Sequence, residues 1–77
     1  MSKLDVLELA AARGEVDSED VSDALGLSAP AAAMALLRLR HQGKLRRQRV
    51  VTEGGTWRFT YQVSDAGAEY LEWAKSR

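Results

Sequence analysis

The most distinctive chemistry in this sequence of 77 residues comes from its basic side chains, because they gather in one segment of a chain whose net charge is zero. Residues 38–58 hold seven basic side chains and one acidic one, whereas residues 1–37 hold two basic and seven acidic ones. The seven are Arg38, Arg40, Lys44, Arg46, Arg47, Arg49 and Arg58. Such asymmetry favours binding to phosphate, although a run of charge can also be only a solvated surface.

No residue combination in the sequence is typical of an active site. There is no cysteine and one histidine, His41, and neither a glycine-rich phosphate loop nor a nucleophile elbow occurs. The acidic residues lie where the solvated faces of helices are expected, and so short a chain encloses a substrate pocket with difficulty. We therefore expect no enzymatic activity, no metal site and no cofactor.

Composition predicts one globular domain over residues 1–77, with 45% apolar and 29% charged residues. A chain without cysteine suits the reducing cytoplasm, since it forms no disulfides. The N-terminus lacks the apolar run of a signal peptide, and the longest uncharged apolar stretch, residues 29–37, is far shorter than the ~20 residues that span a membrane. We expect a soluble, cytoplasmic protein that does not contact membranes.

Capping residues and helical periodicity predict three helices in the first half of the chain. The expected first helix is capped by Ser2 and stops at Gly14, and the second is capped by Asp17 or Ser18 and stops at Gly26. The third is capped by Ser28 and stops at Gly43. The expected apolar faces are Leu4, Leu7, Ala10 and Ala11, then Val21, Ala24 and Leu25, then Ala32, Leu36 and Leu39. Because only Gly26 and Leu27 separate the second helix from the third, the two predict a helix-turn-helix with residues 28–43 as its recognition helix.

A two-stranded hairpin is predicted next, because residues 57–63 alternate apolar with polar side chains and residues 45–51 can pair with them. A loop of two residues (54–55) or four (52–55) would place odd positions of the first strand beside even positions of the second. Arg47, Arg49 and Arg58 would then share a face opposite the aromatic residues. In that register Leu45 misses the core face, so a bulge or twist is expected near it.

Ser64 is expected to cap a final helix with a broad apolar stripe. The stripe consists of Ala66, Gly67, Tyr70, Leu71, Trp73 and Ala74. Aromatic residues at strand or helix spacing usually lie in the core, so core positions are expected for Trp57, Phe59, Tyr61, Tyr70 and Trp73. The predicted fold is of the α+β class, with three helices, a hairpin and a C-terminal helix.

The sequence resembles the winged helix-turn-helix domain of bacterial and archaeal regulators of the MarR and PadR type. The matching residues are 21–28 (VSDALGLS), Leu36, Leu39, Gly43 and 63–67 (VSDAG), so the resemblance extends over nearly the whole chain. It implies that residues 28–43 enter the major groove of double-stranded DNA while the wing, residues 45–63, contacts phosphate or the minor groove. The implied DNA-binding residues are Ala31, Met34, Leu37, Arg38, His41, Lys44, Arg46, Arg47, Arg49 and Arg58.

The outward side of the recognition helix is unusually apolar for a helix that reads bases. A helical wheel places Pro30, Met34, Leu37, Arg38 and His41 outward, with Leu37 expected to be partly buried and Met34 exposed. Base edges are hydrogen-bonding surfaces, and carbon side chains contact little more than thymine methyl groups. An apolar outward face also suits a protein partner.

Two functional hypotheses follow from the sequence. The first is a DNA-binding transcriptional regulator or accessory factor, dimeric through its flanking helices. The alternative is a winged-helix module that binds a protein through the apolar face of residues 28–43. DNA binding that weakens steeply with salt would distinguish the first from the second.

Overall fold

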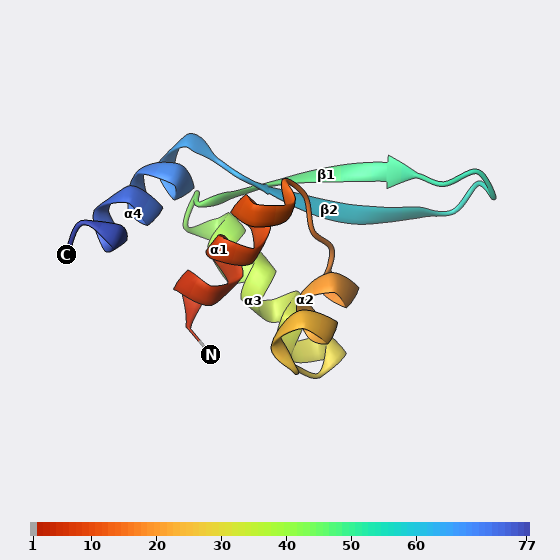
Figure 1. Ribbon diagram of the computed structural model, residues 1–77. Helices are drawn as coiled ribbons and strands as arrows, with labels where there is room; N and C mark the ends of the chain where they lie inside the picture. The colour runs from red at the N-terminus through yellow and green to blue at the C-terminus, as the bar shows by residue number, and fades with distance from the viewer. Residues whose placement is uncertain (1) are drawn as a thin grey trace.

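The helices and strands follow one another in the predicted order in the computed structural model, which describes residues 2–77 (Figure 1). They are α1 (Lys3–Arg13), α2 (Ser18–Leu25), α3 (Ala29–His41), β1 (Leu45–Val51), β2 (Trp57–Val63) and α4 (Asp65–Lys75). The α+β class is confirmed. Figure 1 shows β1 and β2 as a long hairpin that reaches past the helices, with α4 at the opposite end of the molecule.

Each predicted helix begins after an expected cap residue, and in α2, α3 and α4 the cap side chain satisfies a backbone N–H that the helix itself leaves free. Asp17 Oδ1 accepts from the Asp20 N–H at 2.8 Å, Ser28 Oγ from the Ala31 N–H at 3.3 Å and Ser64 Oγ from the Gly67 N–H at 3.1 Å. Gly26 ends α2 with a φ of +67°, a conformation that favours glycine. The helix-turn-helix therefore begins, turns and ends where the sequence predicts.

The core lies between α1, α2, α3 and the base of the hairpin. Its buried apolar residues are Val6, Leu7, Ala10, Val16, Val21, Ala32, Leu36, Leu39, Leu45, Tyr61 and Leu71. The predicted core residues of α3 are confirmed, but Ala11 and Ala24 are exposed. In α1 the buried face includes Val6, so it is rotated relative to the predicted face and turns Ala11 to solvent.

The expectation that all five aromatic residues are core residues is wrong. Only Tyr61 is buried; Phe59 and Tyr70 are half-buried, and Trp57 and Trp73 are 54% and 53% exposed. The outer part of the hairpin extends beyond the helices (Figure 1), and Trp57 is the first residue of β2, on the loop side of the strand. Strand periodicity specifies which residues share a face, but not whether another element covers that face.

The predicted hairpin register is also wrong, because the loop has neither two nor four residues. Val51 lies opposite Trp57, and the Thr52 N–H donates to the Thr56 carbonyl at 2.7 Å, which leaves a three-residue loop. Gly55, with a φ of +83°, donates its N–H to the Thr52 carbonyl at 3.0 Å. An odd loop length pairs odd positions with odd positions, so every side chain of one strand changes face relative to the prediction.

Leu45 shows the consequence of this register. It lies opposite Val63 and is buried, with 3% of its surface exposed, so no bulge is needed to bring it into the core. A further contact holds the base of the hairpin: Val16, between α1 and α2, bridges to Tyr61 on β2. The Val16 N–H donates to the Tyr61 carbonyl at 3.0 Å and the Tyr61 N–H to the Val16 carbonyl at 2.7 Å. The wing is thereby attached to the helical body through backbone hydrogen bonds.

Candidate nucleic-acid interface

The outward side of α3 is exposed as the helical wheel predicts. Ala31, Met34, Arg38 and His41 are all exposed, and Met34 retains 46% of its accessible surface. Leu37 is half-buried but does not pack against the core cluster. The partial burial of Leu37 and the exposure of Met34 are both confirmed. The helix thus presents a carbon surface with two polar side chains, Arg38 and His41, towards its C-terminus.

The wing carries its arginines on both of its faces. Arg47 and Arg49 lie opposite Tyr61 and Phe59, on the same face as the aromatic residues, whereas Arg58 lies opposite Val50 on the other face. The prediction of one arginine face opposite the aromatics is therefore wrong, for the same reason as the register. Arg46, opposite Gln62, shares the face of Arg58 and is exposed.

Arg47 and Arg49 stack on the aromatic side chains of β2. The Arg47 guanidinium lies 4.0 Å from the centre of the Phe59 ring, and the Arg49 guanidinium lies 5.6 Å from that of Trp57. Trp57 meets Phe59 edge to face, with 5.0 Å between ring centres. We call these four residues the arginine–aromatic ladder. Stacked guanidinium groups keep their charge and their outward N–H donors, so both arginines can still bind phosphate.

Arg58 differs from the other wing arginines because it has an acidic partner. Its guanidinium lies 3.2 Å from Asp17 Oδ2, and the Asp17 side chain, which also caps α2, is 12% exposed. The pair borders a hollow of about 310 Å³ between the start of α2, Ala33 of α3 and the Phe59 and Tyr61 side chains of β2. Sequence reasoning missed this contact, since nothing in the local sequence relates position 17 to position 58.

Lys44 is separated from the rest of the predicted interface. It is half-buried, its ammonium lies 5.1 Å from the centre of the Tyr70 ring on α4, and it donates to Gln42 Oε1 at 3.4 Å.

Within residues 2–77 the ion pairs are Arg13 with Asp20 and Arg58 with Asp17. In that part of the chain Arg38, Arg46, Arg47 and Arg49 are therefore positive and unpaired, and α3 packs against the strand that carries the last three.

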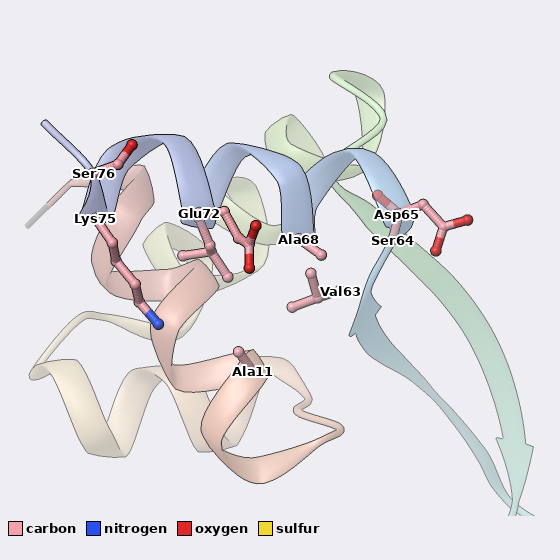
Figure 2. A pocket seen from close by; sticks show the side chains of 9 residues that line it. Ala11, Val63, Ser64, Asp65, Ala68, Glu72, Lys75 and Ser76 are labelled. Carbon is pink, nitrogen blue, oxygen red and sulfur yellow. The ribbon is translucent and has the colours of Figure 1, made fainter.

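A second surface feature is a groove of about 550 Å³ between α1 and α4 (Figure 2). Its floor is apolar, and Figure 2 shows Ala11, Val63 and Ala68 facing one another across it. Its lining is completed by Ser64, Asp65, Leu71, Glu72, Lys75 and Ser76. In the described part of the chain no helix has the length and apolar character to cross a membrane, and no group of three or more His, Asp or Glu side chains could hold a metal ion.

Comparisons with known proteins give a clear answer at the level of fold. No family model matches the sequence, and no curated protein matches it. Among solved structures, PadR of Bacillus subtilis in complex with operator DNA has a TM-score of 0.84 at 19% identity over 97% of this chain. A PadR-like transcriptional regulator of Bacillus cereus has a TM-score of 0.80 at 22% identity over 96% of this chain, and 77% of its own length is covered.

MepR of Staphylococcus aureus is similar as well, with a TM-score of 0.79 at 20% identity; the match covers 96% of this chain and 54% of MepR. This chain spans less than half, 46%, of the length of PadR from Bacillus subtilis. The chain has the winged helix-turn-helix fold found in PadR-like transcriptional regulators, as the resemblance in sequence predicts.

Proposed function

We propose that this chain binds double-stranded DNA as a transcriptional regulator or accessory factor, with α3 in the major groove and the wing on phosphate or in the minor groove. The observation that carries the proposal is a set of unpaired arginines: Arg38 on α3, and Arg46, Arg47 and Arg49 on β1, the strand that packs against α3. A similar fold is solved on operator DNA in the Bacillus subtilis PadR. We place the protein in the cytoplasm with its DNA.

The residue types predict how such binding divides between affinity and specificity. Arginine contacts to phosphate supply affinity that is independent of sequence and falls with salt. The carbon side chains of α3, chiefly Met34, offer only apolar contact with thymine methyl groups. We therefore propose that recognition relies on the backbone and shape of the duplex more than on hydrogen bonds to bases.

The test is a titration of a short random-sequence duplex, followed by fluorescence anisotropy at two salt concentrations. We expect a dissociation constant of roughly 10⁻⁴ to 10⁻⁶ M near physiological salt, and a log-log salt slope that changes by about 0.9 for each phosphate contact removed. The triple variant Arg46→Ala, Arg47→Ala, Arg49→Ala should bind more weakly and with a shallower slope.

The matched control removes the same charge elsewhere, by replacing Lys3, Arg13 and Lys75 with alanine. These residues lie at the two ends of α1 and at the end of α4, outside the strands and loop of the wing. If the control loses as much affinity as the wing variant, net charge and not the wing determines binding. If neither variant loses affinity, the proposed interface is wrong.

A second candidate function is binding of a protein partner through α3. The exposure of Met34, and the position of Leu37 outside the core cluster, favour it, because both leave apolar surface on the outward side of the helix. A protein partner would bury Met34 and Leu37 and leave the wing free to contact DNA.

We further propose that the protein forms a homodimer through α4 and the groove between α1 and α4. Trp73 is exposed on α4, and the Arg77 guanidinium lies 4.7 Å from the centre of its ring. Small apolar side chains line the groove together with the carboxylates of Asp65 and Glu72. The tryptophan of a second copy would cover the apolar surface and its arginine would face the carboxylates, and a two-fold pair would suit a two-fold DNA site.

A further inference from the structure

The arginine–aromatic ladder combines two chemistries on one exposed face of the wing. Arg47 and Arg49 are cationic and have no ion pair within residues 2–77, and the Trp57 side chain is largely exposed. Val51, opposite Trp57, is 63% exposed, so the apolar part of this face is open to solvent. A ligand that satisfies both chemistries has phosphates for the arginines and a flat aromatic surface for Trp57.

We propose that this ladder is a binding site for unpaired nucleotides, in which a base stacks on Trp57 while its flanking phosphates contact Arg47 and Arg49. The proposal rests on the proposed DNA-binding function and adds a class of ligand to it: single-stranded DNA that interrupts or borders the duplex. Stacking on an aromatic side chain is tolerant of sequence, because every base has a flat face.

The position of Trp57 excludes a fully paired duplex as the partner of its ring. Trp57 stands on the flat face of a two-stranded ribbon, not at its tip, and the minor groove of B-DNA is only about 6 Å wide. The tip itself, residues 53–55, offers the carboxylate of Glu53 and two glycines, which give neither charge attraction nor a wedge. A base reaches the ring of Trp57 only if it has left the stack.

The free energy of unstacking a base also favours single-stranded DNA as the ligand. Moving a base out of a paired duplex costs free energy, and the cost is least for a base that is already unpaired. The neighbouring contacts also order the Trp57 ring before a base binds, because Phe59 packs edge to face against Trp57 and Arg49 lies over one face of the ring. An ordered ring loses little conformational freedom when a base binds, so more of the stacking free energy appears as affinity.

The test compares a random-sequence duplex with the same duplex carrying a short single-stranded gap. Trp57 is observed alone in a Trp73→Phe variant, since these are the two tryptophans of the chain. We expect binding to the gapped duplex to be roughly tenfold tighter and to quench the emission of Trp57, as stacking of a base on the ring predicts. Equal affinity together with unchanged emission would overturn the proposal, as would equal quenching by the fully paired duplex.

Variants separate stacking from the general stability of the wing. Trp57→Ala should abolish the preference for the gapped duplex, whereas Trp57→Phe should retain most of it because a flat ring remains. Gln48→Ala alters an exposed side chain on the opposite face of the same ribbon and should leave the preference unchanged. A preference that persists in Trp57→Ala would overturn the proposal, and the quenching experiment on unmutated Trp57 does not depend on the folding of that variant.

The proposed binding of duplex DNA and the proposed site for unpaired nucleotides can be overturned by different results. Quenching of Trp57 by oligothymidine, without binding to paired duplex, would overturn the proposed duplex binding and support the site for unpaired nucleotides. Binding to paired duplex, without quenching of Trp57 by either the gapped duplex or oligothymidine, would support the proposed duplex binding and overturn the site for unpaired nucleotides.

Discussion

A Cβ atom on Gly67 would lie 2.1 Å from the carbonyl oxygen of Lys44, so the first turn of α4 packs directly against the backbone that follows α3. Ser64 holds the same two segments together: its N–H donates to the Lys44 carbonyl at 3.0 Å, and its hydroxyl donates to the Gly43 carbonyl. The serine and glycine that resemble the regulator signature therefore have a physical role here. They fix α4 to the end of α3.

The first prediction concerns this close packing. Gly67→Ala should lower the free energy of unfolding by about 2–4 kcal/mol, because the new methyl group meets backbone atoms that cannot move aside like a flexible side chain. Urea denaturation followed by circular dichroism measures the change. Gly54→Ala is the control, since nothing lies within 4 Å of a Cβ at that loop position and its φ is not positive. Equal losses in both variants would contradict the packing argument.

The second prediction separates the two roles of Asp17. Asp17→Ala should cost about 1–2 kcal/mol of stability, because it removes the cap of α2 as well as the partner of Arg58. Arg58→Ala should cost less than about 1 kcal/mol, since the arginine end of the pair is 60% exposed to water. Thermal and urea denaturation of the two single variants give the comparison. A larger loss for Arg58→Ala would mean that the ion pair, and not the cap, is the main contribution.

The third prediction concerns DNA binding by the same ion pair. Asp17→Asn keeps an oxygen that can cap α2 but removes the negative charge beside Arg58. The freed guanidinium should then bind phosphate, which raises the affinity for random duplex at low salt and steepens the salt slope by up to about 0.9. Glu53→Gln, which removes one negative charge from the tip of the wing, is the control for net charge. An identical effect of both substitutions would show that Arg58 does not gain a phosphate contact.

The fourth prediction decides between DNA and protein as the ligand of α3. Met34→Ser combined with Leu37→Ser should change stability by less than a core substitution would, since each fully buried large apolar side chain contributes roughly 1.5–3 kcal/mol and neither residue lies in the core. If α3 reads DNA, selection from a random-sequence duplex pool should yield altered sequence preferences with the salt slope unchanged. Unaltered DNA binding and selection would favour a protein partner instead.

The fifth prediction tests self-association. Sedimentation equilibrium at high micromolar concentration should show a species of twice the 8.5 kDa chain mass, and Trp73→Ala should shift the population towards the monomer. Trp57→Ala provides the control, because it removes a tryptophan of similar exposure from the wing. A parent protein that remains a monomer throughout would rule out the dimer.

Local signals predict most of this fold, because caps and apolar periodicity act within a few residues. Ser28, Ser64 and Gly26 show this, since each bounds a helix as expected. The errors concern relationships between distant segments. Trp57 is exposed because no helix within residues 2–77 covers the outer hairpin, and Arg58 pairs with Asp17 across 41 positions of the chain.

The sequence predicts which residues of the candidate site are exposed on α3, but not which face of the wing carries each arginine. The outward residues of α3 follow from a helical wheel, because the helix has one regular period and a known buried face. The faces of the wing depend in addition on one integer, the length of the loop. A loop of two or four residues puts Arg47 and Arg49 on the side opposite the aromatic residues, whereas the observed three-residue loop puts them on the same side.

The pairing of the two strands also constrains how such a wing can change during evolution. Inserting or deleting one residue inside β1 or β2 would turn the side chains on one side of the change to the opposite face, so that Arg47 and Arg49 would no longer share a face with both Phe59 and Trp57. A change at positions 53–55 leaves every pairing in place and alters only the reach of the loop. Homologous wings that keep this arrangement should therefore differ in length within the loop and keep the length of their strands.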